Sequence, residues 1–218
     1  MTMFAPRFRL LLITTLSVVV AGAWAETKQN VVSHDSRFAD QAARLQRQGW
    51  SFDLIFSELC RTALANVEAN PKLQLHDQIR SVFGGLWLWM SRGGNAHIQG
   101  RHDWAFHFIG GGAFEGYWDV GRSAALTKEQ LDAKNPHNRF DKDDLAATLL
   151  GARWMELATR SDPAQARRWV ELWATRQLTI ERSLPPLRYG QMPKGERASA
   201  ETIAAIRRDI DAAFHLPN

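Results

Sequence analysis

The sequence is poor in cysteine, and its one cysteine has no partner. Cys60 stands alone among 218 residues, so no disulfide can form within the chain. It lies on an apolar helical stripe with Ile55, Phe56 and Leu59, where a free cysteine usually packs as a small hydrophobe. A catalytic thiol needs a base placed beside it, so we expect Cys60 to be buried rather than nucleophilic.

Long apolar runs are also scarce. The most apolar segment, residues 10–20, is interrupted by two threonines and a serine. It is shorter than the roughly 20 apolar residues that a transmembrane helix needs. No later stretch is long and apolar enough, so we expect no transmembrane span in the mature chain.

The N-terminus has the order of a secretory signal peptide. Arg7 and Arg9 precede the apolar run, and Ala23 and Ala25 form a small-x-small cleavage site. We expect residues 1–25 to be cleaved and the mature chain to be exported, to the periplasm or the extracellular space. An uncleaved N-terminal anchor is the alternative. A lipidation cysteine is missing near the cleavage point, which disfavours a lipoprotein.

Neither sign of charge is in large excess. The whole chain has 27 basic and 23 acidic residues and a formal charge of +4. Loss of the two signal arginines leaves 25 basic residues and a charge of +2. This charge is too small to indicate a nucleic-acid partner. The basic residues lean toward the C-terminal third, which favours a solvated face; contact with an anionic membrane or cell wall is the alternative.

The apolar spacing predicts an all-α protein. Apolar residues recur every three or four positions in most segments, and no stretch of useful length alternates as a strand would. We expect residues 26–35 to form a flexible lead and residues 36–218 to form a single domain of about six or seven helices. A mature chain of this length can bury an adequate core without disulfides.

Capping residues and breakers give the expected helix boundaries. Ser36 is expected to cap the first helix, and Pro71 follows the end of the second. Asp141, Asp162 and Ser199 each precede a new apolar period, and the proline after Asp162 suits a first helical position.

Polar side chains gather in residues 102–144. Asp103 and His107 are four residues apart and share a helix face, as do Glu129 and Asp132 at a spacing of three. His107 and Glu129 are too far apart to meet along one straight helix. We therefore expect the helix to break near residues 119–121 if the two faces cooperate.

This composition suits two kinds of chemistry. His107, Glu129, Asp132 and Asp144 are the candidate acid/base residues of a hydrolase directed at cell wall or lipid. Asp103, His107, Glu129 and Asp132 are the alternative candidates, as ligands of a divalent metal ion. The sequence indicates no other cofactor.

A purely structural role explains the same residues. His107 could be a hydrogen-bonded core histidine that orients neighbouring helices. Lys128 and Asp132 have the spacing of an ion pair on a helix surface. Asp141 and Asp144 have the spacing of an acidic helix start.

Common catalytic signatures are missing, and the tryptophans favour a core. The sequence has no Gly-x-Ser-x-Gly elbow, no His-Glu-x-x-His helix and no phosphate-binding Walker loop. Trp87, Trp89, Trp104 and Trp118 lie at helical spacing, which is more typical of core positions than of a wall facing sugar or lipid.

Three short motifs carry a family resemblance. They are His-Phe-x-Gly-Gly from His107, Lys-Glu-x-x-Asp from Lys128, and Phe-Asp-x-x-Asp-Leu-x-Ala-x-x-x-Gly from Phe140. Over about residues 103–151 the chain resembles YfiM-type small bacterial envelope proteins. The resemblance implies a helical core and an envelope location, and it implies no reaction.

Together these features predict an exported protein of the bacterial envelope. Our first hypothesis is a non-catalytic role in binding a protein partner or an envelope component. The second is an exported hydrolase that uses the cluster around His107.

Overall fold

The structure of the chain is a computed structural model that describes residues 28–135, 138–183 and 185–214. Contacts divide the chain into two units, residues 1–34 and 35–218. The expected signal peptide lies outside the described residues. Of the first unit the structure describes only residues 28–34, which are helical.

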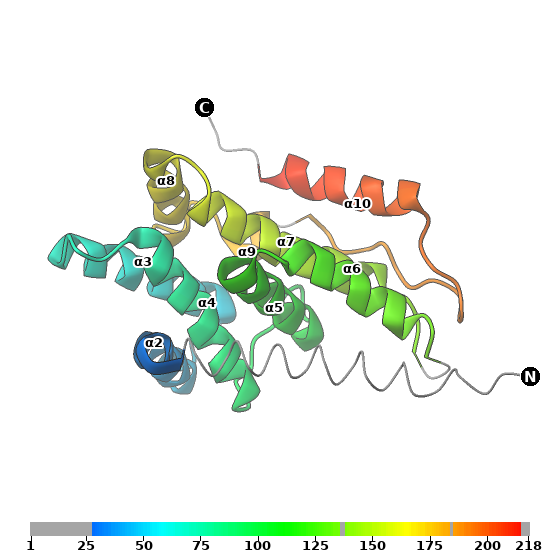
Figure 1. Cartoon of the computed structure of the whole chain (residues 1–218). Helices are drawn as coiled ribbons and strands as arrows, with labels where there is room; N and C mark the ends of the chain where they lie inside the picture. Colours follow the sequence, from blue (N-terminus) through cyan, green and yellow to red (C-terminus); the bar gives the residue numbers. More distant parts are fainter. Residues whose placement is uncertain (1–27, 136–137, 184, 215–218) are drawn as a thin grey trace, which may run out of the picture. The chain divides into compact units, whose positions relative to one another are not determined.

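The described part of the chain is all-α, as the sequence predicts, and contains no strand (Figure 1). Its helices are α2 (Lys28–Arg47), α3 (Phe52–Ala69), α4 (Leu75–Ser91), α5 (His102–Trp118), α6 (Gly121–Asp132), α7 (Lys142–Thr159), α8 (Pro163–Ala174), α9 (Ile180–Ser183) and α10 (Ala200–Ala213). The described residues form more helices than the six or seven expected, because the central segment forms two helices and α9 adds a single turn. None of them is long and apolar enough to cross a bilayer.

Most helix boundaries agree with the capping residues. Asp141, Asp162 and Ser199 each accept a hydrogen bond from a backbone N–H two or three residues further on. The first boundary differs from the prediction. Helix α2 begins at Lys28 and continues through Ser36, so the expected lead is helical from Lys28 onward. No proline or glycine interrupts this segment, and a started helix propagates easily through such residues.

The central helix breaks where the sequence predicts. Asp119 adopts a left-handed conformation with φ 57°, which ends α5, and α6 begins two residues later at Gly121. A Cβ at Gly121 would lie 2.5 Å from the carbonyl oxygen of Gly111, so only glycine fits this return. Helix α6 consequently packs against both α5 and α7.

Helices α5 and α7 touch through their backbones. A Cβ at Gly111 of α5 would lie 2.0 Å from the Thr148 carbonyl oxygen of α7. A Cβ at Gly151 of α7 would lie 1.8 Å from the Phe108 carbonyl oxygen of α5. These separations leave no room for a side chain, so glycine at both positions sets the spacing and register of the pair.

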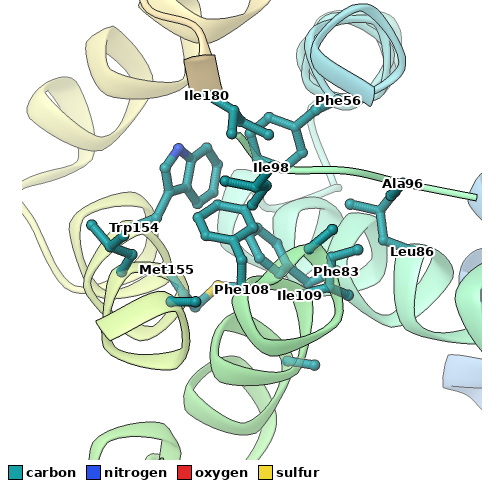
Figure 2. Packing of buried hydrophobic residues seen from close by; sticks show 14 of the residues in the cluster. Phe56, Phe83, Leu86, Ala96, Ile98, Phe108, Ile109, Trp154, Met155 and Ile180 are labelled. Carbon is teal, nitrogen blue, oxygen red and sulfur yellow. The ribbon is translucent and has the colours of Figure 1, made fainter. Parts of the chain in front are cut away.

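Aromatic rings fill the core around this helix pair (Figure 2). Phe56 of α3 meets Phe83, Phe108 and Trp154 with ring centroids 5.1 to 5.9 Å apart, mostly edge to face. Such pairs add about 1 kcal/mol each beyond the burial of their area. Cys60 is fully buried as predicted, and burial raises the pKa of its thiol, so it has no nucleophilic character.

We predict that Gly111→Ala lowers the free energy of unfolding by about 3 kcal/mol or more, because the new methyl group would displace backbone rather than a flexible side chain. Gly116→Ala in the same helix is the matched control, since its Cβ would meet side chains only, the end of Met155 at 2.9 Å and Cγ of Arg80 at 3.3 Å. Denaturant unfolding of the two variants measures the difference. Equal effects would contradict the backbone contact.

Candidate functional site

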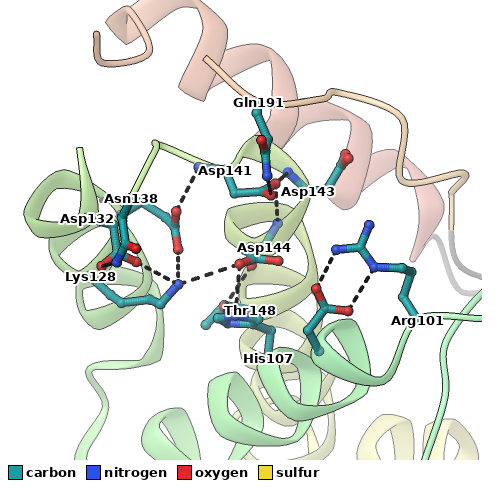
Figure 3. A network of polar contacts seen from close by, with 12 residues as sticks. Arg101, His107, Lys128, Asp132, Asn138, Asp141, Asp143, Asp144, Thr148 and Gln191 are labelled. Atoms are coloured by element: carbon teal, nitrogen blue, oxygen red, sulfur yellow. Dashed lines mark hydrogen bonds and ion pairs between the residues drawn. The ribbon is translucent and has the colours of Figure 1, made fainter. Parts of the chain in front are cut away.

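His107 joins α5 to the first turns of α7 (Figure 3). Its Nε2 lies 3.1 Å from Oδ2 of Asp144, and its Nδ1 lies 3.1 Å from the hydroxyl oxygen of Thr148. The side chains of His107 and Asp144 are 14% and 15% exposed. The close approach of α5 and α7 makes this contact possible, because Gly111 follows His107 by one helical turn.

The proton positions follow from the partners. Thr148 donates its hydroxyl hydrogen to the Asp144 carbonyl oxygen at 2.9 Å, so its oxygen is free only to accept from His107. The Asp144 carboxylate likewise accepts. Both ring nitrogens of His107 therefore face an oxygen within the fold.

Asp144 is ionised in this setting. Burial acts to raise its pKa, but the hydrogen bond and charge of His107, together with the charge of Lys128, outweigh burial and hold the pKa below its ordinary value. Its other carboxylate oxygen, Oδ1, is buried without a hydrogen-bond partner among the described residues.

Lys128 of α6 connects three carboxylates. Its Nζ lies 2.6 Å from Glu129, 3.0 Å from Asp132 and 3.6 Å from Asp144. Burial alone would lower the pKa of Lys128, but the adjoining carboxylates raise it above its ordinary value. The cluster therefore extends over α5, α6 and α7, with His107 and Lys128 both close to Oδ2 of Asp144 (Figure 3).

Glu129 is the most deeply buried member of this cluster. Its side chain is 1% exposed, and its Oε2 accepts the backbone N–H of Asp141 at 2.9 Å. Burial raises its pKa, and the Lys128 hydrogen bond offsets this only in part. Glu129 thus fastens the end of α6 to the residue that caps α7.

A second buried glutamate also accepts a backbone N–H near the start of a helix. Glu115 of α5 is 5% exposed and accepts the backbone N–H of Gly121, at the start of α6, at 3.0 Å. Its other oxygen lies 2.9 Å from the guanidinium of Arg160. Buried carboxylates therefore hold the starts of both α6 and α7.

The structure brings four predicted site residues into this cluster and separates the fifth. Lys128 links Glu129, Asp132 and Asp144, and Asp144 links His107 to them. Asp103 instead pairs with Arg101, whose hydrogen bonds lower the pKa of its carboxyl. In the described part of the chain, no three histidine, cysteine, aspartate or glutamate side chains are arranged to hold a metal ion.

Sequence reasoning missed two members of the site. Thr148 lies four residues after Asp144 on the same face of α7, a spacing that could have indicated it. Gln191 donates to Oδ2 of Asp141 at 2.8 Å from a distant loop, and no local pattern signals that contact.

The four tryptophans of the central region divide between core and surface. Trp89 and Trp104 are buried, in agreement with the core prediction, whereas Trp87 and Trp118 are half-buried. Trp87 and Trp118 lie close to two phenylalanines, with ring centroids 4.7 to 5.9 Å apart. Together these rings form a continuous aromatic patch. The aromatic patch consists of Trp87, Phe106, Phe114 and Trp118.

Comparison of the chain with protein-family models, curated proteins and solved structures gave no match.

We predict a pH-dependent effect of Asp144→Asn. The folded pKa of Asp144 lies below its unfolded value of about 3.9. The stability that it contributes is therefore present above about pH 4 and is lost as the pH falls through the folded pKa. The variant should be about 2 kcal/mol less stable than the wild type at pH 7, with a smaller difference at pH 3. Denaturant unfolding at several pH values measures this difference.

Glu129→Gln is the matched control for the sign of the pH dependence of stability. The folded pKa of Glu129 is raised, so the stability tied to its protonation is present at low pH and lost as the pH rises through the folded value. The advantage of the wild type over this variant should therefore shrink with rising pH. Two variants with the same pH dependence would contradict the assignment of the two carboxylates.

Proposed function

We propose that the chain is an exported protein of the bacterial envelope that binds lipid surfaces and performs no chemistry. The signal-like N-terminus and the resemblance to YfiM-type envelope proteins support the location. The observation that carries the non-catalytic role is the internal pairing of the charged cluster, which uses the ring nitrogens of His107 and the charge of Lys128 within the fold.

The order of Asp144, His107 and Thr148 resembles a catalytic triad only in its connectivity. A triad serine or threonine gives its proton to the histidine, and its oxygen faces the substrate. Thr148 is 8% exposed, and its hydroxyl donates to a carbonyl of its own helix. Both ring nitrogens of His107 are already paired, with Asp144 and with Thr148. These features favour a structural joint.

The aromatic patch supports lipid as the binding partner. Phe106 is 37% exposed, and Trp87 lies over Gly110, where a Cβ would be 2.9 Å from its ring. Tryptophan beside phenylalanine on one half-exposed face is typical of surfaces that enter the boundary between headgroups and acyl chains. Phenylalanine has no polar atom for sugar recognition, so the composition favours lipid over glycan.

A hydrolase is the second candidate, and one observation favours it. Oδ1 of Asp144 is buried next to His107 without a partner in the described part of the chain, and an unpaired buried polar atom can mark a catalytic site. The direct test is turnover of lipid esters and cell-wall fragments by the wild type and by His107→Gln. We expect no turnover in either. Turnover that disappears in His107→Gln and persists in Trp50→Ser would establish the hydrolase.

The proposed function predicts a specific loss of lipid binding. We expect the exported chain, with a mass corresponding to a start at Glu26, to sediment with vesicles of phosphatidylethanolamine and phosphatidylglycerol. Phe106→Ser should weaken this binding roughly fivefold, because it removes an apolar side chain from the contact.

Trp50→Ser is the matched control, since Trp50 is also 37% exposed but lies outside the aromatic patch. Its binding should equal that of the wild type. Absence of vesicle binding, or equal losses in both variants, would overturn the proposal, and binding to peptidoglycan in its place would identify a glycan partner.

A further inference from the structure

A tight two-residue turn precedes α5. Ile98 and Arg101 exchange backbone hydrogen bonds of 3.0 and 2.9 Å. Between them, Gln99 and Gly100 both have positive φ, 49° and 79°, as a type I′ hairpin turn requires. The buried side chain of Ile98 anchors the turn in the core. Its backbone is therefore fixed on both sides.

The side chain of Gln99 clamps this turn to a distant loop. Its amide nitrogen donates to the Pro185 carbonyl at 3.0 Å, and its amide oxygen accepts the Leu187 N–H at 3.0 Å. These two bonds copy the pattern of a β-bridge. The turn is consequently fixed by its own backbone hydrogen bonds and by the side-chain bonds of Gln99 to the distant loop.

Two histidines flank the turn on the same side. His97 and His102 are the next pair outward from Ile98 and Arg101, and facing residues in such a pair have Cα atoms about 4.5 Å apart. Their ring centroids lie 5.6 Å apart with planes inclined by 60°. Both residues are exposed, so the space between the rings is open to solvent.

The tautomer of His102 is fixed by its backbone partner. Nδ1 of His102 lies 2.9 Å from the Ala96 carbonyl oxygen, which can only accept a hydrogen bond. The proton of the neutral ring is therefore on Nδ1, and Nε2 keeps its lone pair. Metal-binding histidines commonly have this arrangement, with one nitrogen donating to a carbonyl and the other free to coordinate.

The spacing of the rings also suits a shared metal ion. With metal–nitrogen bonds of about 2.1 Å, two imidazole centroids lie roughly 4.6 Å apart at the 90° angle of neighbouring ligands on copper(II), and roughly 5.3 Å apart at a tetrahedral angle. The observed 5.6 Å is slightly longer than both, so a small change in ring position would bring the two nitrogens to one ion. Rotation of the exposed His97 side chain can turn its nitrogen toward the ion without moving the clamped backbone.

We propose that His97 and His102 form a two-histidine site for a late first-row divalent metal ion, with copper(II) bound more tightly than nickel or zinc. Imidazole nitrogen suits these ions, and copper is preferred in the usual affinity order. Two protein ligands leave the remaining positions for water or for a ligand from a partner. The site is separate from the cluster at His107 and does not depend on lipid binding.

Copper titration of the untagged full chain tests the site, by calorimetry and by electron paramagnetic resonance. We expect one copper(II) ion per chain with hyperfine coupling to two nitrogens. His97→Ala and His102→Ala should each weaken binding at least tenfold. His76→Ala is the matched control, because His76 is an exposed histidine paired with Asp77 at 3.2 Å; it should bind as the wild type does.

Circular dichroism of the variants checks that the exposed substitutions leave the fold intact. Copper that remains equally tight in either His97→Ala or His102→Ala would overturn the proposal and place the ion elsewhere. The proposal would also be overturned if the wild type bound no stoichiometric copper.

Discussion

The structure depends on the backbone contact between α5 and α7. Gly111 and Gly151 let the two helices approach until carbonyl groups occupy the places where side chains would stand. Phe108, one turn before Gly112, then packs into the aromatic core, and His107 beside it reaches Asp144 across the interface. The close approach of α5 and α7 therefore permits both the aromatic core and the polar cluster.

The buried carboxylates complete this arrangement at the helix ends. Glu115 holds the start of α6 and Glu129 holds the residue that caps α7, each through a backbone N–H. Burying a carboxylate is costly unless its oxygens are paired, and here Arg160 and Lys128 supply the opposite charges. The paired charges therefore connect helices, and the aromatic patch and the histidine pair lie outside this cluster.

The sequence was informative wherever the signal is local. Caps at Asp141 and Asp162 follow from residue types at fixed spacing, and they were predicted. The break before Gly121 was expected only on the condition that the two polar faces meet. The pairing of Asp103 with Arg101 was not predicted, because the rotation of the helix decides whether the Asp103 side chain faces Arg101 or His107. Contacts between distant segments depend on register between helices, which a single sequence does not encode locally.

A double-mutant cycle on His107→Ala and Asp144→Asn tests the central claim most directly. If the two side chains join α5 to α7, the double variant should lose less stability than the sum of the single variants. We expect a coupling energy of roughly 1 to 3 kcal/mol at pH 7, as for residues that share a hydrogen-bonded ion pair. Additive losses, with a coupling near zero, would contradict a structural joint at this site.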